Sequence, residues 1–515
     1  MPKQQFQFPA GWRFAILILA LVVLVRLPSI QQPLDNDSGA IAYHARLINQ
    51  GEPLYGTHHP AHHLPGSYYT YAFIFRILGD NPASLKIALI FVVWLTAWLL
   101  FLLGRQLAGE KAGFLAAAFF ALIGSMTNLL GDSAEIELFA NLPLTLGIWL
   151  AARLIQKRSQ PAVYILAGMV GALAFLYKVN YLASLAALGV AILLEAVLEK
   201  KNTGWITFIW RSLALLCGVG IVLGPVVGYF ISLGYWERFL LVFQMGVNYV
   251  GMNQAQPVSF FILIPILIIL QANAALFVIS MVGAIRIIKQ TPQVLRSDRS
   301  QGLVHILVVT WLVVSIFEVG SSRMPFPHYG LLLIPPLSLV TALEIIAIYK
   351  QIPKSSFRLA CLPALMVAMI IANTLFTSRN YLGGYFQYIT GQKTCTEFVR
   401  QDTGLGDQKN EAILTANYLA SHTFPTETIF LWSDQAQIYY HANRRASTDI
   451  IWPQYIAALG SPERVFVSRP RYIVIGPVFL KNYQTPPDWL VQELASHYSY
   501  ETTIGPNSLY RRKTP

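Results

Sequence analysis

PLDNDSGAIAYHARLINQGEPLY, residues 33–55, directly follows an apolar run at residues 13–30. A run of this length matches the ~20 apolar residues that a helix needs to cross a bilayer. The bulky LPSIQQPLD that ends the run differs from the small-residue cleavage site of a signal peptide, so we expect an uncleaved span. The chain therefore emerges from a membrane just before a polar segment that carries two acids.

Apolar runs recur along most of the chain. Of its 515 residues, 55% are apolar and 12% are charged, whereas soluble domains carry about 25% charged residues. We therefore expect a polytopic α-helical membrane domain at residues 1–380. The stretch 258–288 is long for one crossing, and its Pro265, Gln271 and Asn273 predict either a kink or an interfacial start. The expected spans, eleven in all, are 13–30, 85–104, 112–130, 139–157, 160–178, 181–198, 206–233, 258–288, 303–320, 329–349 and 357–377.

The connections between these spans alternate in charge. Short loops rich in Lys and Arg stay in the cytoplasm, so the net charge of +12 reflects topology and no nucleic acid partner is expected. We expect an integral protein of the plasma or inner membrane with a cytoplasmic N-terminus, an outer loop at 31–84 and an extracytoplasmic C-terminal domain. The basic set is Lys3, Arg13, Arg105, Lys111, Arg153, Lys157, Arg158, Lys200, Lys201, Arg211, Arg286, Lys289, Arg296, Arg299, Lys350, Lys354 and Arg358.

The outer loop and the C-terminal tail have structure of their own. Residues 38–50 and 66–78 show helical periodicity, and the second segment carries aromatic residues suited to a membrane interface, so we expect two interfacial helices. The tail, residues 381–515, is expected to form a small α/β domain. Its expected elements are a helix at 410–422, a strand at 428–432, a helix at 433–443, a strand at 471–476 and a helix at 488–498.

Two acidic pairs lie where spans leave the membrane on the outer side. Asp35 and Asp37 follow the first span, and Glu135 and Glu137 follow the third. Carboxylates near a bilayer mark function more often than those in soluble loops, and one of these acids is expected to act as a general base. Alternatively, Asp37 and Ser38 cap a surface helix, and the two glutamates are solvated loop acids. Because residues two apart do not share a helical face, only one glutamate is expected to point into a site.

Cations for a developing phosphate charge are also present on the outer side. The candidates are Lys178, Arg323 and the histidines of HHPAHH, residues 58–63. Imidazole also suits zinc and manganese, so the histidines have three open interpretations: phosphate contact, metal binding, or an interfacial loop. Lys178 could equally be a lysine that reaches toward the interface, and Arg323 and His328 could be structural.

Several motifs in this order resemble the GT-C superfamily of polyprenyl-phosphate-sugar glycosyltransferases. One span leads into an Asp-led helix, then Gly51, PLY and a Pro and Tyr-Tyr element. AEIELFANLPLTL at 134–146 is similar to the acidic second outer loop of that family, and RMPFPHYGLLLIPPL at 323–337 to its Arg, His-Tyr and Pro-Pro span. The branch it resembles includes protein O-mannosyltransferases and lipid A aminoarabinose transferases, and the likeness extends over residues 10–380.

The resemblance implies roles for individual residues. The first-loop catalytic acid falls on Asp37, with Asp35 as its competitor, and the second on Glu137, with Glu135 still possible. His63 takes the place of a lysine that precedes the Tyr-Tyr element in relatives, so a permanent cation becomes a titratable one. The implied lipid-phosphate site is His63, Lys178, Arg323, His328, Tyr68 and Tyr69. A divalent ion (Mn, Mg or Zn) is an optional cofactor, with His59 and His62 as its expected ligands.

The expected function is transfer of a sugar from undecaprenyl or dolichyl phosphate to a protein, lipid or glycan acceptor on the outer face. Direct in-line attack, with Asp37 as general base, would invert the anomeric carbon. The expected partners are the lipid-linked donor, the acceptor and membrane lipids. The alternatives are a flippase or transporter of lipid-linked sugars, a ligase or polymerase of surface polysaccharide, and a non-catalytic scaffold.

Overall fold

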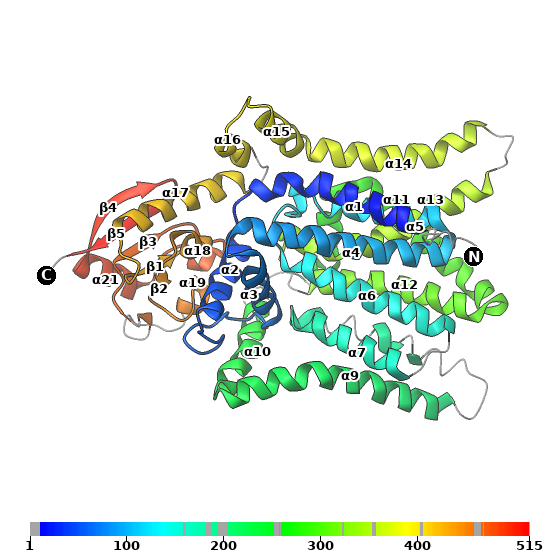
Figure 1. Ribbon diagram of the computed structural model, residues 1–515, viewed down its shortest axis with the longest axis horizontal. Helices are drawn as coiled ribbons and strands as arrows, with labels where there is room; N and C mark the ends of the chain where they lie inside the picture. The colour runs from blue at the N-terminus through cyan, green and yellow to red at the C-terminus, as the bar shows by residue number, and fades with distance from the viewer. Residues whose placement is uncertain are drawn as a thin grey trace, which may run out of the picture.

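The computed structural model describes residues 11–157, 161–181, 187–190, 192–193, 204–251, 257, 259–321, 324–352, 357–401, 405–457, 465–466 and 468–513. Long helices run roughly alongside one another, and a small α/β region, residues 406–512, lies at one end of this bundle (Figure 1). The helices of the bundle are α1 (Trp12–Arg26), α4 (Pro82–Ala108), α5 (Glu110–Ile123), α6 (Ile136–Lys157), α7 (Pro161–Phe175), α9 (Gly204–Ser232), α10 (Trp236–Gly251), α11 (Phe260–Ser297), α12 (Arg299–Gly320), α13 (Ile334–Gln351) and α14 (Phe357–Thr377).

Six helices of the described residues are long and apolar enough to span a membrane, or seven if the bent pair 361–377 and 379–389 forms one span. Many of their apolar side chains are exposed: only 11% of the most apolar window of 205–232 is buried. Because such a surface is unstable in water, the chain is an integral membrane protein. The predicted span 181–198 lies mostly outside the described residues, and α5, α7 and α13 are shorter than the spans predicted there.

Of the two alternatives predicted for the long stretch 258–288, a kink or an interfacial start, the structure shows the kink. Within α11, Asn273 has non-helical backbone angles, φ −159° and ψ 93°. Its side chain pairs on both sides: Oδ1 accepts from the backbone N of Leu276 at 2.9 Å, just after the break, and Nδ2 donates to Thr374 Oγ1 of α14 at 3.0 Å. A buried amide thus stabilises a kink against α14.

The stretch predicted as one span at 329–349 is divided in two. Residues Pro327–Leu332 form a 3-10 helix, η4, and α13 begins only at Ile334. Pro335 and Pro336 follow at once, and proline fits the first turn of a helix because those amides have no intrahelical acceptor. The 3-10 turn brings His328 and Tyr329 to the end of the bundle nearest the α/β region.

Basic residues gather at the opposite end of the bundle. Arg13 pairs with Glu110 at 3.5 Å, Lys350 donates to the carbonyl of Ala108 at 3.3 Å, and the Lys111 ammonium lies 4.9 Å from the centre of the Tyr349 ring. These contacts join the ends of α1, α4, α5 and α13. Three residues of the basic set, Arg13, Lys111 and Lys350, therefore lie together at the end of the bundle away from the α/β region.

The α/β region contains a five-stranded sheet in the order β2-β1-β3-β5-β4. β1 (Thr428–Trp432) pairs in parallel with β2 (Arg445–Ala446) and β3 (Tyr472–Ile475), with Phe430 opposite Ile473. β5 (Asn507–Arg512) runs antiparallel to β3 and to β4 (Tyr498–Ile504). The remaining elements there are α17 (Gly406–His422), α18 (Gln437–Ala442), α19 (Pro453–Ile456), η6 (Lys481–Tyr483) and α21 (Asp488–His497).

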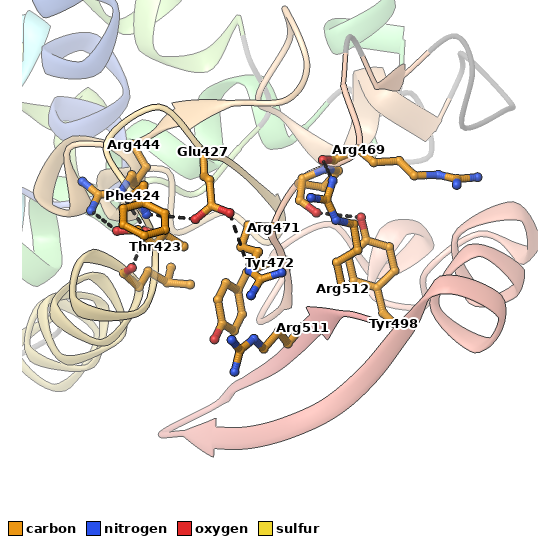
Figure 2. Close-up of polar contacts among 12 residues, drawn as sticks. Thr423, Phe424, Glu427, Arg444, Arg469, Arg471, Tyr472, Tyr498, Arg511 and Arg512 are labelled. Carbon is orange, nitrogen blue, oxygen red and sulfur yellow. Dashed lines mark hydrogen bonds and ion pairs between the residues drawn. The ribbon is translucent and has the colours of Figure 1, made fainter. Parts of the chain in front are cut away.

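The predicted strands at 428–432 and 471–476 and the helices at 410–422 and 488–498 match β1, β3, α17 and α21. The predicted helix 433–443 is reduced to α18, because Ser433 and Asp434 belong to a turn. The β4–β5 hairpin was not predicted. Figure 2 shows how Glu427 fixes the start of β1, since it accepts from the backbone N of Phe424 at 2.9 Å and pairs with Arg471 at 3.6 Å.

Both helices predicted in the first outer loop are present, as α2 (Asn36–Asn49) and α3 (Gly66–Leu78). They lie between the bundle and the α/β region (Figure 1). α2 packs directly on α18, and a Cβ at Gly39 would overlap Gln437 of that helix. A side chain at this position would therefore push the two elements apart. Further helices complete the connection to the α/β region: α15 (Arg379–Ile389) and α16 (Cys395–Arg400).

Candidate active site

Asp35 and Asp37 have different surroundings at the start of α2. The Asp35 Oδ1 accepts from the backbone N of Ser38 at 2.8 Å and from its hydroxyl at 2.6 Å, while that hydroxyl accepts from the backbone N of Asp35 at 3.2 Å. Asp35 is thus the helix cap, and it is buried. Asp37 takes no part in this capping box, and its side chain, 47% exposed, lines a cavity.

The two carboxyl groups also differ in acidity. Burial alone would raise the pKa of Asp35, but Lys409 and Lys86 outweigh it and hold the pKa below the usual 3.8. Burial raises the pKa of Asp37 to about 6, Asp35 and Glu137 add to the rise, and His328 opposes it. Water reaches Asp37 through the cavity, yet protein surrounds the cavity, so desolvation still dominates. Asp37 therefore has the properties of a base that works near neutral pH.

Glu135 and Glu137 both line the small pocket beside Asp37, so the prediction that only one would point into a site is wrong. The helical spacing rule does not apply, because α6 begins at Ile136 and Glu135 precedes it. Glu137 is buried and pairs with Lys178 at 3.3 Å. Burial, with the charges of Asp35 and Asp37, raises the pKa of Glu135 well above its usual 4.5.

Cationic and aromatic residues also line this pocket. His328 Nε2 lies 3.9 Å from Asp37 Oδ2, and the Lys178 ammonium lies 3.8 Å from the centre of the Tyr329 ring. His63 and Tyr68 line the same pocket. Tyr69 does not, and its ring faces Tyr229 at 6.4 Å. Arg323 lies outside the described residues. Of the ten residues predicted as catalytic or phosphate-binding, the structure brings six around Asp37: Glu135, Glu137, His63, Lys178, His328 and Tyr68.

The other histidines of residues 58–63 make separate contacts. His58 Nδ1 lies 2.8 Å from Nδ1 of His44, and the two rings stack. His59 Nε2 lies 2.8 Å from the carbonyl oxygen of Arg238. His62 Nδ1 lies 2.6 Å from the hydroxyl of Tyr455. This loop therefore joins α2 to α10 and α19. Burial and the charge of Lys178 lower the pKa of His63 to about 4, so His63 is neutral at pH 7 and offers a hydrogen bond rather than a charge.

Sequence reasoning missed a buried charge network behind Asp35. Lys409, from α17, pairs with Asp132 at 3.0 Å, and Lys86, from α4, donates to the Asp132 carbonyl at 2.7 Å. Arg26 donates to the carbonyl of Gly131 at 2.8 Å in the same loop. All four side chains are buried. The network ties the α/β region to the loop that carries the second acidic pair.

A cavity of about 670 Å³ extends from Asp37 to the α/β region. Its lining includes Asp35, Asp37 and Glu135 and, from the α/β region, residues that follow β1, α18 and β3, among them Trp452 and Phe479. Trp452 also lines the small pocket beside Asp37. The volume of the cavity is in the range of a small-molecule site. Trp452 and Phe479 were also missed, because only the fold brings the tail to the membrane helices.

One group of side chains could hold a metal ion. The ligand atoms of Asp37, Glu135 and His328 all lie within 4.8 Å of one another. Two carboxylates and an imidazole suit Mn²⁺ and Zn²⁺, and the donor set fits Mg²⁺ less well. His59 and His62, the ligands expected from the sequence, are not part of this group, and their role as a metal pair stays a prediction.

Comparisons with known proteins give a family match and a shared fold. Residues 58–229 match the family described as dolichyl-phosphate-mannose-protein mannosyltransferase. The structure also resembles ArnT from Cupriavidus metallidurans bound to undecaprenyl phosphate, with a TM-score of 0.60 and 12% identity over 98% of this chain and 98% of that chain.

The chain has the GT-C fold.

A second GT-C structure is the oligosaccharyltransferase AglB from Archaeoglobus fulgidus in complex with an inhibitory peptide and a dolichol-phosphate. Its TM-score is 0.56, with 12% identity over 98% of this chain and 74% of that one. The same archaeal enzyme with Zn and sulfate gives a TM-score of 0.56 and 13% identity over 97% and 73% of the two chains. No curated protein matches the sequence significantly. The family and these structures are glycosyltransferases.

Proposed function

We propose that the chain transfers a sugar from a polyprenyl-phosphate carrier, undecaprenyl or dolichyl, to a hydroxyl of an acceptor on the outer face of the membrane. The observation that carries this proposal is the pocket in which Asp37, with its raised pKa, faces Lys178, His63 and His328. A base and a set of phosphate-binding groups within one pocket are the parts that displacement of a lipid phosphate requires. The GT-C fold and the matched family support the donor class.

The proposed topology follows from the two ends of the bundle. The end with Arg13, Lys111 and Lys350 is cytoplasmic by the positive-inside rule, which places the N-terminus inside. The acids and the α/β region then lie outside, where nucleotide sugars are absent and lipid-linked sugars are present. We also propose that the chain divides into a membrane domain, residues 1–380, and an extracytoplasmic domain, residues 381–515.

The proposed reaction is one displacement at the anomeric carbon. The acceptor oxygen forms the new bond to that carbon while its proton passes to a carboxylate oxygen of Asp37. The bond from the anomeric carbon to the phosphate oxygen breaks, and its electron pair leaves with the polyprenyl phosphate. A single in-line displacement inverts the configuration. Glu137, held by Lys178 at 3.3 Å and by the Tyr181 hydroxyl at 3.4 Å, orients the lysine rather than the acceptor.

The leaving phosphate is proposed to be held by Lys178, His63, His328 and Tyr68. Lys178 is the only charged donor among the described residues that line the small pocket, apart from the titratable histidines. Neutral His63 can donate one hydrogen bond. Arg323 and Tyr69 remain sequence-based candidates for the same task.

The proposal is tested with the full chain in lipid nanodiscs and synthetic undecaprenyl-phosphate sugars that carry mannose, glucose or aminoarabinose. Release of undecaprenyl phosphate is measured by chromatography, and the stereochemistry of any product by NMR. Release that depends on Asp37 supports a transferase. Lipid movement across vesicles without release would instead indicate the flippase.

The rate of transfer should depend on pH through Asp37. Because its carboxylate acts as the base, protonation removes activity, so kcat/KM is expected to fall about tenfold per pH unit below the pKa of about 6 and to level off above it. A pH profile of donor cleavage between pH 4.5 and 8 checks this. A rate that rises as the pH falls through this range would contradict the role of Asp37.

We further propose that a divalent ion binds Asp37, Glu135 and His328. When bound, it would supply a positive charge for the leaving phosphate. Mn²⁺ binding, followed by electron paramagnetic resonance of the purified chain, is expected to weaken at least tenfold in Glu135→Gln and His328→Ala, and to stay unchanged in the exposed control His422→Ala. If His59→Ala weakens binding and the other variants do not, the ion belongs to the histidine loop.

A further inference from the structure

The wall that the α/β region contributes to the 670 Å³ cavity has the chemistry of a binding site. It is built by the α/β region, chiefly through Trp452, Gln454, Gln435 and Phe479, and Asn128 adds an amide from the membrane helices. The mechanism proposed above uses none of these residues. They line the same cavity as Asp37, and Trp452 also lines the small pocket beside it, so an acceptor bound to them lies within reach of that carboxylate.

Several polar atoms of this wall have no partner. Trp452 Nε1, Gln454 Oε1, Gln435 Nε2 and Asn128 Oδ1 are buried without a hydrogen bond. In two of these side chains the second polar atom of the amide is hydrogen-bonded, which holds the amide in place. Gln435 Oε1 accepts from Asn507 Nδ2 at 2.7 Å, and Asn128 Nδ2 donates to the Ala272 carbonyl at 3.2 Å. Buried polar groups are nearly always paired, and the residues that carry these four atoms all line the cavity, so a ligand with hydroxyl groups bound there would give them partners.

The wall that the α/β region contributes to the cavity offers no cation to an anionic ligand. Its described lining residues include no Lys, Arg or His, and its acid is Asp434. Lys178 and His328 lie instead beside Asp37, where the leaving phosphate is proposed to bind. A phosphate or carboxylate on an acceptor held against the α/β wall would therefore have no cation to pair with.

The wall also lacks the feature that captures extended peptides. Such peptides commonly add to a free sheet edge, but the edge strands β2 and β4 contribute no residue to the described lining of the cavity. Amide side chains, which both donate and accept, together with the flat faces of Trp452 and Phe479, instead match the hydroxyls and C–H faces of a sugar ring.

We propose that Trp452, Gln454 and Gln435 form the acceptor subsite and that the acceptor is an uncharged carbohydrate. This inference rests on the proposed function, because it takes Asp37 as the base that the acceptor hydroxyl must reach.

Saturation-transfer NMR on the full chain in nanodiscs, without donor, tests the inference. The probes are the methyl glycosides of glucose, mannose, galactose and N-acetylglucosamine, together with glucose 1-phosphate and an uncharged Ser/Thr octapeptide. At least one glycoside should show transfer, and its signal should fall at least fivefold in Gln454→Met and in Trp452→Phe. The control Gln484→Met, at an exposed position outside the cavity, should leave the signal unchanged.

The inference is overturned if only the peptide or glucose 1-phosphate binds, if no probe binds, or if both cavity variants keep the glycoside signal. Each variant must retain the melting temperature of the parent chain. Two cavity variants are used, so the test still stands if one of them fails to fold. The outcome is separate from that of the proposed function. Donor cleavage without glycoside binding contradicts only the acceptor subsite, whereas absence of donor cleavage contradicts the transferase itself.

Discussion

Asp37→Asn is expected to lower the rate of sugar transfer by roughly 10² to 10⁴-fold, the usual contribution of a positioned general base. The amide keeps the shape of the side chain but cannot take the proton of the acceptor hydroxyl. Binding of undecaprenyl phosphate should change little, because Lys178 and His63 remain in place. The measurement is kcat for donor cleavage, with donor binding followed separately.

Asp35→Asn is the matched control for this variant. It changes the same residue type two positions earlier, at a buried carboxylate that caps α2. Loss of part of a capping box costs about 1 kcal/mol of stability, with a smaller loss of rate than at Asp37. If Asp35→Asn lost more activity than Asp37→Asn, the result would identify Asp35, and not Asp37, as the base.

Lys409→Met should destabilise the chain by roughly 3–5 kcal/mol, the usual effect of removing one partner of a buried ion pair. The substitution removes the ammonium that lies 3.0 Å from the Asp132 carboxylate and leaves that carboxylate buried. Lys86 still donates to the backbone carbonyl of Asp132. Thermal unfolding of the purified chain in detergent checks the loss, with Lys481→Met at an exposed position of the same region as control.

The double variant Lys409→Met with Asp132→Leu separates the pair from its packing. Because replacing both charges by apolar groups is often neutral, the double variant should recover most of the stability lost in Lys409→Met. An equal or larger loss in the double variant would show that Lys409 acts through its packing and that the ion pair itself contributes little.

The sequence predicts most of the long apolar helices, though not α10, and both outer-loop helices, because their signals are local. Helical periodicity places α2 and α3, and the break at Asn273 follows from polar residues within an apolar run. The same local pattern places an acidic pair at the outer end of the first span. It does not separate Asp35 from Asp37, since that depends on which carboxylate Ser38 engages.

The parts that were missed depend on contacts between distant segments. Lys409 lies in a polar helix whose pattern gives no sign of burial, and only the docking of α17 on the membrane helices brings it to Asp132. Trp452 and Gln454 reach the cavity for the same reason. His63 resembled a titratable cation in the sequence, and its surroundings make it neutral, because burial outweighs its intrinsic basicity.

The close packing of α2 on α18 at Gly39 has a mechanical consequence. The backbone of α2, which carries Asp37, contacts α18 directly at Gly39, so movement of one element is transmitted to the other. A ligand that tilts the α/β region is therefore expected to shift Asp37, the proposed base, as well.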